Sequence, residues 1–102
     1  MKKINEKEFE ECTKTGVSIV DFYATWCGPC RMFGEILEEI EEEIGDKVNI
    51  LKVDVDENEG LSRKFGVLSI PTILIMKDGA LQEKHIGVWS KEDCIEAVKK
   101  YL

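Results

Sequence analysis

Two long apolar runs, separated by one stretch with helical spacing, restrict this chain to a small set of folds. Residues 17–24 read VSIVDFYA and residues 48–55 read VNILKVDV, which is typical of strands covered on both faces. Between them, residues 29–44 carry apolar side chains at helical intervals. A strand, a helix and a second strand in this order predict a right-handed crossover between parallel strands.

The remaining segments extend this pattern into a complete α/β sheet. A short helix is expected at 6–14, where Asn5 and Glu8 have the spacing of a capping box. The other expected elements are a helix at 57–65, strands at 72–77 and 80–88 joined by the hairpin signal Asp78-Gly79, and a helix from Ser90 to Tyr101. We therefore predict a three-layer α/β sandwich, with a central mixed β-sheet between helices on both faces.

Length and charge narrow the class of protein further. The 102 residues suit one domain, which we expect to span residues 1–102. The net charge of −7 argues against nucleic acid as a partner, because phosphate binding needs clustered Lys and Arg. We expect no signal peptide, since the first residues lack an apolar core, and no membrane helix, since no apolar stretch approaches about 20 residues. A cytoplasmic protein is therefore expected.

The cysteine pair in W-C-G-P-C, residues 26–30, lies where the first long strand gives way to a helix. Pro29 suits the first helical position, and the helix dipole with its free N–H groups favours a thiolate at Cys27, lowering its pKa. Cys30 follows at i+3, a spacing at which a disulfide can close and reopen by exchange. The sequence predicts a redox pair in which Cys27 is the exposed nucleophile and Cys30 is the resolving thiol.

A metal site and a permanent structural disulfide are weaker interpretations of this pair. Zinc needs a second ligand pair, and a reducing cytosol disfavours permanent disulfides. The other cysteines, Cys12 and Cys94, are isolated, and each is expected on an inward helix face as a small buried hydrophobic residue. His85, the only histidine, is expected to be exposed on an edge strand. We therefore expect no metal ligands.

Two charged residues interrupt the apolar strands. Asp21 stands inside the first run and Lys52 inside the second, so both are expected on buried strands. A buried carboxyl is costly unless it is paired or protonated, so the pKa of Asp21 should rise. Two opposite charges on two neighbouring apolar strands suggest a partner arrangement, and a structural ion pair is one interpretation of it.

The segment VDFYATWCGPCRMF, residues 20–33, resembles the active-site segment of the thioredoxin family, and Ile70-Pro71-Thr72 follows about forty residues later. The resemblance covers nearly the whole chain. It implies a thioredoxin-like fold and a thiol–disulfide oxidoreductase that reduces protein disulfides through a mixed disulfide on Cys27, resolved by Cys30.

The resemblance also implies roles for residues outside the cysteine pair. Asp21 would be the general acid/base for Cys30, tuned by Lys52. Pro71 would be cis, and the backbone of Ile70 would bind an extended substrate segment. The implied substrate-binding surface consists of Trp26, Gly28, Pro29, Ile70, Pro71, Gly87 and Val88.

Cofactors and partners follow from the same resemblance. It implies that no cofactor is bound, and that a thioredoxin reductase linked to NADPH or to ferredoxin supplies the electrons. The other partners would be proteins that contain disulfides, and we expect the chain to be a monomer.

The chain departs from the family pattern at several places, two of which are the helix at Glu35 and the rim at Leu68 and Ser69. Glu35, after Gly34, stands where the helix often carries a proline, so a proline kink is not expected. Leu68 and Ser69 stand where many members have a basic or polar residue and a glycine, which makes the rim of the site more apolar.

Three other functions are open from the sequence alone. One is an oxidase or isomerase, which runs the same chemistry in reverse. A measured reduction potential would distinguish it from a reductase. A binding module with dispensable cysteines would keep its activity when both are changed to serine. A metal site would be detected by a zinc assay on the reduced protein.

Overall fold

A computed structural model describes all residues from 1 to 102 and contains five strands and four helices. In chain order they are β1 (Lys2–Lys3), α1 (Glu6–Thr13), β2 (Val17–Tyr23), α2 (Gly28–Ile44), β3 (Asn49–Asp54), α3 (Glu59–Lys64), β4 (Thr72–Lys77), β5 (Ala80–Ile86) and α4 (Lys91–Lys99). The predicted elements are confirmed in order from α1 to α4, with ends that differ by at most two residues, and the short strand β1 precedes them. No helix is both long enough and apolar enough to cross a membrane.

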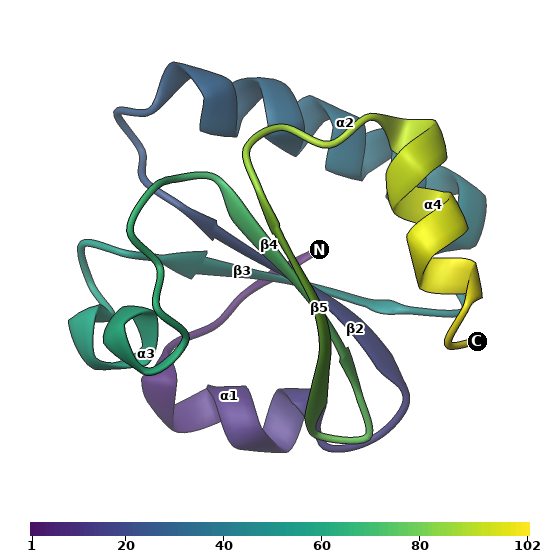
Figure 1. Cartoon of the computed structure of the whole chain (residues 1–102), viewed down its shortest axis with the longest axis horizontal. Coiled ribbons are helices and arrows are strands. Elements are labelled where there is room, and N and C mark those ends of the chain that lie inside the picture. Colours follow the sequence, from purple (N-terminus) through teal and green to yellow (C-terminus); the bar gives the residue numbers. More distant parts are fainter.

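The strands form one mixed sheet in the order β1-β3-β2-β4-β5 (Figure 1). β1 and β2 run parallel to β3, whereas β4 is antiparallel to both β2 and β5. The predicted hairpin is confirmed, with positive φ angles of 48° at Asp78 and 83° at Gly79. Glycine suits such an angle because it has no Cβ to clash with the backbone.

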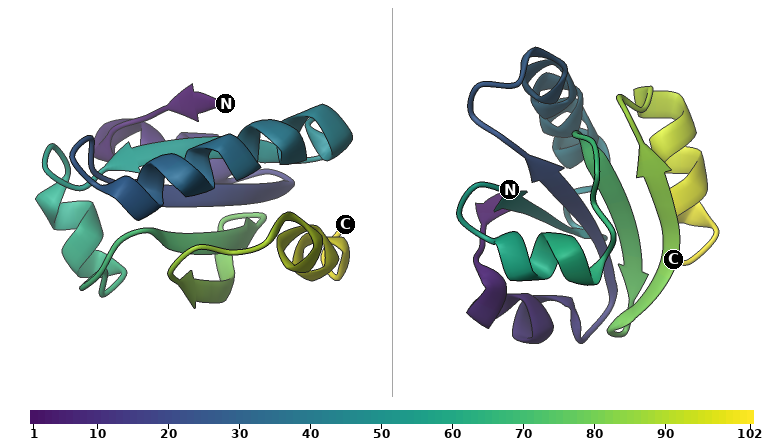
Figure 2. Two further views of the ribbon diagram at one scale, coloured as in Figure 1. Left: turned by 90° about the horizontal axis from the view of Figure 1, so that it is seen from above. Right: turned by 60° about the vertical axis from the view of Figure 1, so that its left-hand side comes forward.

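Two helices cover each face of the sheet, which makes the predicted three layers (Figures 1 and 2). Helices α2 and α4 lie on one face, and α1 and α3 lie on the other. Alternate residues of β2 point to opposite faces. Val17 and Ile19 therefore contact the α2–α4 side, and Val20 and Phe22 contact the α1–α3 side.

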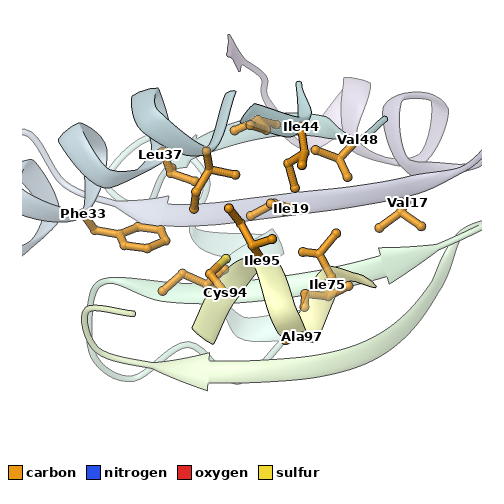
Figure 3. Packing of buried hydrophobic residues seen from close by; sticks show 14 residues of the cluster. Val17, Ile19, Phe33, Leu37, Ile44, Val48, Ile75, Cys94, Ile95 and Ala97 are labelled. Atoms are coloured by element: carbon orange, nitrogen blue, oxygen red, sulfur yellow. The ribbon is translucent and has the colours of Figure 1, made fainter. Parts of the chain in front are cut away.

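The larger apolar cluster fills the space between the sheet, α2 and α4 (Figure 3). Phe33 and Leu37 of α2 meet Ile19 of β2, and Cys94 and Ile95 approach from α4. By strand alternation, Asp21 points to this same face, two residues beyond Ile19. The fold therefore directs a carboxyl group toward the underside of α2.

Helix α2 begins at Gly28, one residue earlier than predicted, and runs without interruption for 17 residues. Pro29 occupies the first turn, and Cys27 is the N-cap residue. Glu35 replaces the proline common in the family, and the helix passes through this position unbroken. The start of α2 thus places Cys27 and Cys30 at the end of the sheet where β2 terminates.

Candidate redox site

Cys27 and Cys30 form a disulfide at the N-terminus of α2, with their Cα atoms 5.2 Å apart. The sulfur of Cys27 caps the helix, because it accepts a hydrogen bond of 3.2 Å from the backbone N–H of Cys30. An N–H group directed at sulfur stabilises negative charge on it. The geometry suits a pair that alternates between a disulfide and a dithiol with its charge on Cys27.

The two cysteines are both largely covered by neighbouring residues. Cys27 is 6% exposed and Cys30 is 3% exposed, so the prediction of an exposed Cys27 is wrong. Ala24 packs with both cysteines, and Ile70 lies against the same small cluster. Little of either cysteine is therefore open to solvent, and of the two Cys27 is the more exposed.

Asp21 is fully buried beneath this part of the molecule, as predicted. Neither of its carboxyl oxygens has a hydrogen-bond partner within the protein. Burial raises the pKa of Asp21 from 3.8 to about 7, and the positive charge of Lys52 opposes this rise. Desolvation is the larger effect, so the carboxyl holds its proton in acidic solution and releases it near neutral pH.

Lys52 is the neighbour of Asp21 on β3, in register with it across the parallel pair. Its ammonium lies 4.3 Å from the centre of the Tyr23 ring, which is a cation–π contact. The alternative of a structural ion pair with Asp21 is not formed. Lys52 therefore acts on Asp21 through its charge and not through a hydrogen bond.

A cavity of about 330 Å³ lies beside Cys30 and Lys52. A glycine, Gly34, faces Lys52 across it, and a Cβ atom there would lie 3.8 Å from the ammonium nitrogen. The other lining residues are Met1, Tyr23, Ala24, Thr25, Arg31, Glu35 and Glu38. The cavity therefore lies between Cys30, the resolving cysteine, and the acidic residues Glu35 and Glu38 of α2.

A cis peptide bond joins Ile70 to Pro71 opposite the cysteine pair. The carbonyl oxygen of Ile70 lies 4.0 Å from the sulfur of Cys27. On the other side, the backbone N–H of Gly87 donates a hydrogen bond of 2.8 Å to the carbonyl of Pro71. Three segments that are far apart in sequence therefore meet around Cys27.

The rim of the site carries apolar side chains, several of them exposed. Trp26 is 68% exposed, and its indole N–H donates a hydrogen bond of 2.8 Å to Asp56. Leu68 is 98% exposed, on the segment before the cis proline. Gly28, Pro29 and Val88 are exposed, Ile70 and Gly87 are half-buried, and Pro71 is buried. The Pro71 ring is therefore covered by its neighbours, and its carbonyl is already paired with the N–H of Gly87.

Sequence reasoning missed two side chains of this region. Asp56, which holds the Trp26 ring, follows β3, and nothing in the local sequence indicates an indole partner thirty residues away. Ile86 is an exposed apolar residue at the end of β5, directly before Gly87. The alternation of β5 could have indicated its exposure, because neighbouring residues of an edge strand face opposite sides.

The remaining cysteines and the histidine lie outside the site. Cys94 is fully buried, as predicted, and burial, with a smaller effect of Glu83, raises its pKa to about 12. Cys12 is only half-buried, which corrects the prediction of an inward position. His85 is also half-buried, because its ring stacks on Trp89 at 4.3 Å. No group of three or more His, Cys, Asp or Glu residues could hold a metal ion.

The fold and the site together define a thiol–disulfide oxidoreductase. A reversible cysteine pair caps a helix at the end of an α/β sheet, and a cis proline faces it. The model of the Thioredoxin family matches residues 1–100. The chain belongs to the Thioredoxin family.

Relatives and solved structures agree with this assignment. The chain is 50% identical to thioredoxin of Listeria monocytogenes serovar 1/2a over 102 residues, covering 100% of this chain and 99% of the relative. It is 47% identical to thioredoxin of Bacillus subtilis over 100 residues, covering 98% and 96% of the two chains. A mutant thioredoxin from Halobacterium salinarum has the same fold, with a TM-score of 0.89, 30% identity and coverage of 98% and 90%.

The family assignment establishes the reaction. The chain is a protein-disulfide oxidoreductase that works by dithiol/disulfide exchange, through a mixed disulfide on Cys27 that Cys30 resolves. Members of this family exchange electrons with a reductase and with proteins that contain disulfides.

Proposed function

We propose that Cys27 and Cys30 reduce the disulfides of partner proteins with the help of Asp21 and Lys52. The Cys27 thiolate attacks one sulfur of the target disulfide, and the second target sulfur leaves and takes up a proton. Cys30 then loses its proton and attacks Cys27, which releases the target as a dithiol and leaves the Cys27–Cys30 disulfide. Two electrons pass from the pair to the target.

Asp21 is proposed as the general acid/base for Cys30. It points to the face of the sheet that α2 covers, its oxygens are free, and its pKa of about 7 lies near the working pH. Lys52 is proposed to tune this group, because its charge favours the ionised carboxylate and lowers the pKa of Asp21.

The rim is proposed to bind an extended segment of the target. The carbonyl of Ile70 lies beside Cys27, and a backbone group in that place can pair with a strand added from a partner. Trp26, with its face exposed and its N–H held by Asp56, offers a fixed apolar surface. The other proposed contacts are Gly28, Pro29, Pro71, Gly87 and Val88.

The proposed partners are a thioredoxin reductase, linked to NADPH or to ferredoxin, and disulfide-containing targets. We propose that the chain works as a monomer, as one domain without a bound cofactor, in the cytoplasm.

The capping of Cys27 by the N–H of Cys30 is the observation on which the proposal rests, and Cys30→Ser tests it. Without the resolving thiol, Cys27 should accumulate targets as mixed disulfides, which dithiothreitol releases and mass spectrometry identifies. The Cys27→Ser/Cys30→Ser variant is the control and should capture nothing. Equal recovery from both variants, together with a wild type that does not accelerate insulin reduction by dithiothreitol, would contradict the proposal.

A further inference from the structure

The segment between α3 and the cis proline is held in place at both of its ends. At its start, Gly66 has a φ of 63° and the N–H of Val67 donates a hydrogen bond of 2.9 Å to Ser62. At its end, the hydroxyl of Thr72 donates a hydrogen bond of 2.6 Å to the carbonyl of Ser69. Leu68, between these points, is almost fully exposed, so an exposed side chain stands on a fixed backbone.

Lys84 of β5 provides two polar contacts to the start of this segment. Its ammonium donates hydrogen bonds of 3.0 Å to the carbonyl of Phe65 and of 2.9 Å to the carbonyl of Gly66. Phe65 is the C-cap residue of α3, so the positive charge also meets the negative end of that helix. The ammonium has no carboxylate partner.

Gly66 is matched to this contact in two ways. Its positive φ is a conformation that favours glycine, and a Cβ atom there would lie 3.3 Å from the Lys84 nitrogen. Any larger residue would press on the ammonium that holds the carbonyls. The glycine and the lysine therefore form one structural unit, although 18 residues separate them.

We propose that Lys84 is a positioning residue for thiol–disulfide exchange with protein substrates. By holding the carbonyls of Phe65 and Gly66, it fixes the start of a short segment whose end places the Ile70 carbonyl beside Cys27. The surface is then ordered before a substrate binds, so the free energy of binding does not include the entropic cost of ordering it. This inference rests on the substrate-binding role proposed above for Ile70.

The kinetics of Lys84→Met test the proposal. Methionine keeps most of the side-chain stem and removes the charged donor. With insulin as the protein disulfide and dithiothreitol as the electron donor, KM should rise about fivefold while kcat is unchanged, since one anchor of a preformed surface is lost. Reduction of glutathione disulfide, which is too small to span the rim, should keep its wild-type rate.

Two further variants separate positioning from general effects of charge or folding. Lys84→Arg should restore the wild-type KM, because a guanidinium can donate to both carbonyls. Lys77→Met is the matched control, since Lys77 is an exposed lysine without a side-chain partner and its loss changes the net charge equally. Its KM should equal that of the wild type.

Several results would overturn the proposal. One is a KM of Lys84→Met equal to that of Lys77→Met. Another is a KM of Lys84→Arg raised as much as that of Lys84→Met. A third is a loss of rate by Lys84→Met that is as large with glutathione disulfide as with insulin. If Lys84→Met does not fold, Lys84→Gln must show the raised KM, and no rise in that variant overturns the proposal. A wild type that reduces insulin leaves the proposed function standing in all these cases, whereas an inactive wild type overturns both.

Discussion

At the scale of single residues, Asp21 shows how burial and charge compete. Its carboxyl lies in the core without a hydrogen-bond partner, away from the water that would stabilise its ionised form. The nearby ammonium of Lys52 favours ionisation but does not outweigh desolvation, so the pKa remains raised. A group in this state stabilises the folded protein least when it is ionised.

Replacing Asp21 by asparagine should therefore change how stability depends on pH. Because the folded pKa of about 7 lies above the unfolded value of 3.8, the folded protein binds the extra proton between them. The stability of the wild type then falls as pH rises through this window, and Asp21→Asn escapes that fall. Between about pH 4 and pH 8, the free energy of unfolding of the variant should gain roughly 3–4 kcal/mol relative to wild type.

Guanidinium unfolding of the oxidised proteins at these two pH values measures the difference. Asp46→Asn is the control, since Asp46 is exposed and its variant should track the wild type. The same Asp21→Asn variant should exchange disulfides about a hundredfold more slowly near neutral pH, the lower end of what a lost general acid/base costs. A pH-independent difference in stability would show that Asp21 ionises normally in the folded protein.

At the scale of elements, the side chains that precede the helices make two kinds of hydrogen bond. Asn5, Cys27 and Ser90 each cap their own helix through a bond to a backbone N–H in the first turn. Asn58, before α3, makes no such bond. Its side chain accepts from the N–H of Glu6 and donates to the carbonyl of Asp54, which ties α1 to the end of β3.

These two kinds of contact should differ in their contribution to stability. Ser90→Ala removes one cap and should cost about 1 kcal/mol of unfolding free energy. Asn58→Ala leaves a partly buried N–H and a buried carbonyl unpaired and should cost about 2–4 kcal/mol. Urea unfolding of both variants measures the difference, and insulin reduction should be unchanged for Ser90→Ala. A smaller loss for Asn58→Ala than for Ser90→Ala would contradict this account.

The difference between these residues also shows what sequence can predict. The capping box of Asn5 and the cap of Ser90 depend on spacings of three residues, so they were visible locally and are confirmed. The buried carboxyl of Asp21 was visible because it interrupts an apolar run. The contacts of Asn58 with Glu6, of Asp56 with Trp26 and of Lys84 with the end of α3 join segments 18 to 52 residues apart, and no local pattern encodes them.

At the scale of the whole molecule, the two apolar clusters share one sheet. The cluster under α2 and α4 and the cluster under α1 and α3 use opposite faces of β2, β3 and β4. Loss of packing on one face therefore loosens the strands that support the other. We expect one cooperative transition for the molecule and not two.

Leu37 and Leu74 test this expectation from opposite faces, since each is fully buried in a different cluster. Leu37→Ala and Leu74→Ala should each lower the free energy of unfolding by about 2–5 kcal/mol. In both variants, tryptophan fluorescence and far-UV circular dichroism should report the same midpoint. Leu102→Ala, at an exposed position, is the control, and separate midpoints would mean that the two faces unfold independently.

The borders of the sheet have a consequence for crowded solutions. One border is β1, two residues long and made of Lys2 and Lys3, and the other is β5, which carries exposed Gln82 and Lys84. Short or charged edge strands do not accept a further strand from a neighbouring copy. The β1 border, two lysines long, therefore resists adding a strand from another copy, whereas β5 also exposes Leu81 and Ile86 and is the edge at which a copy could add.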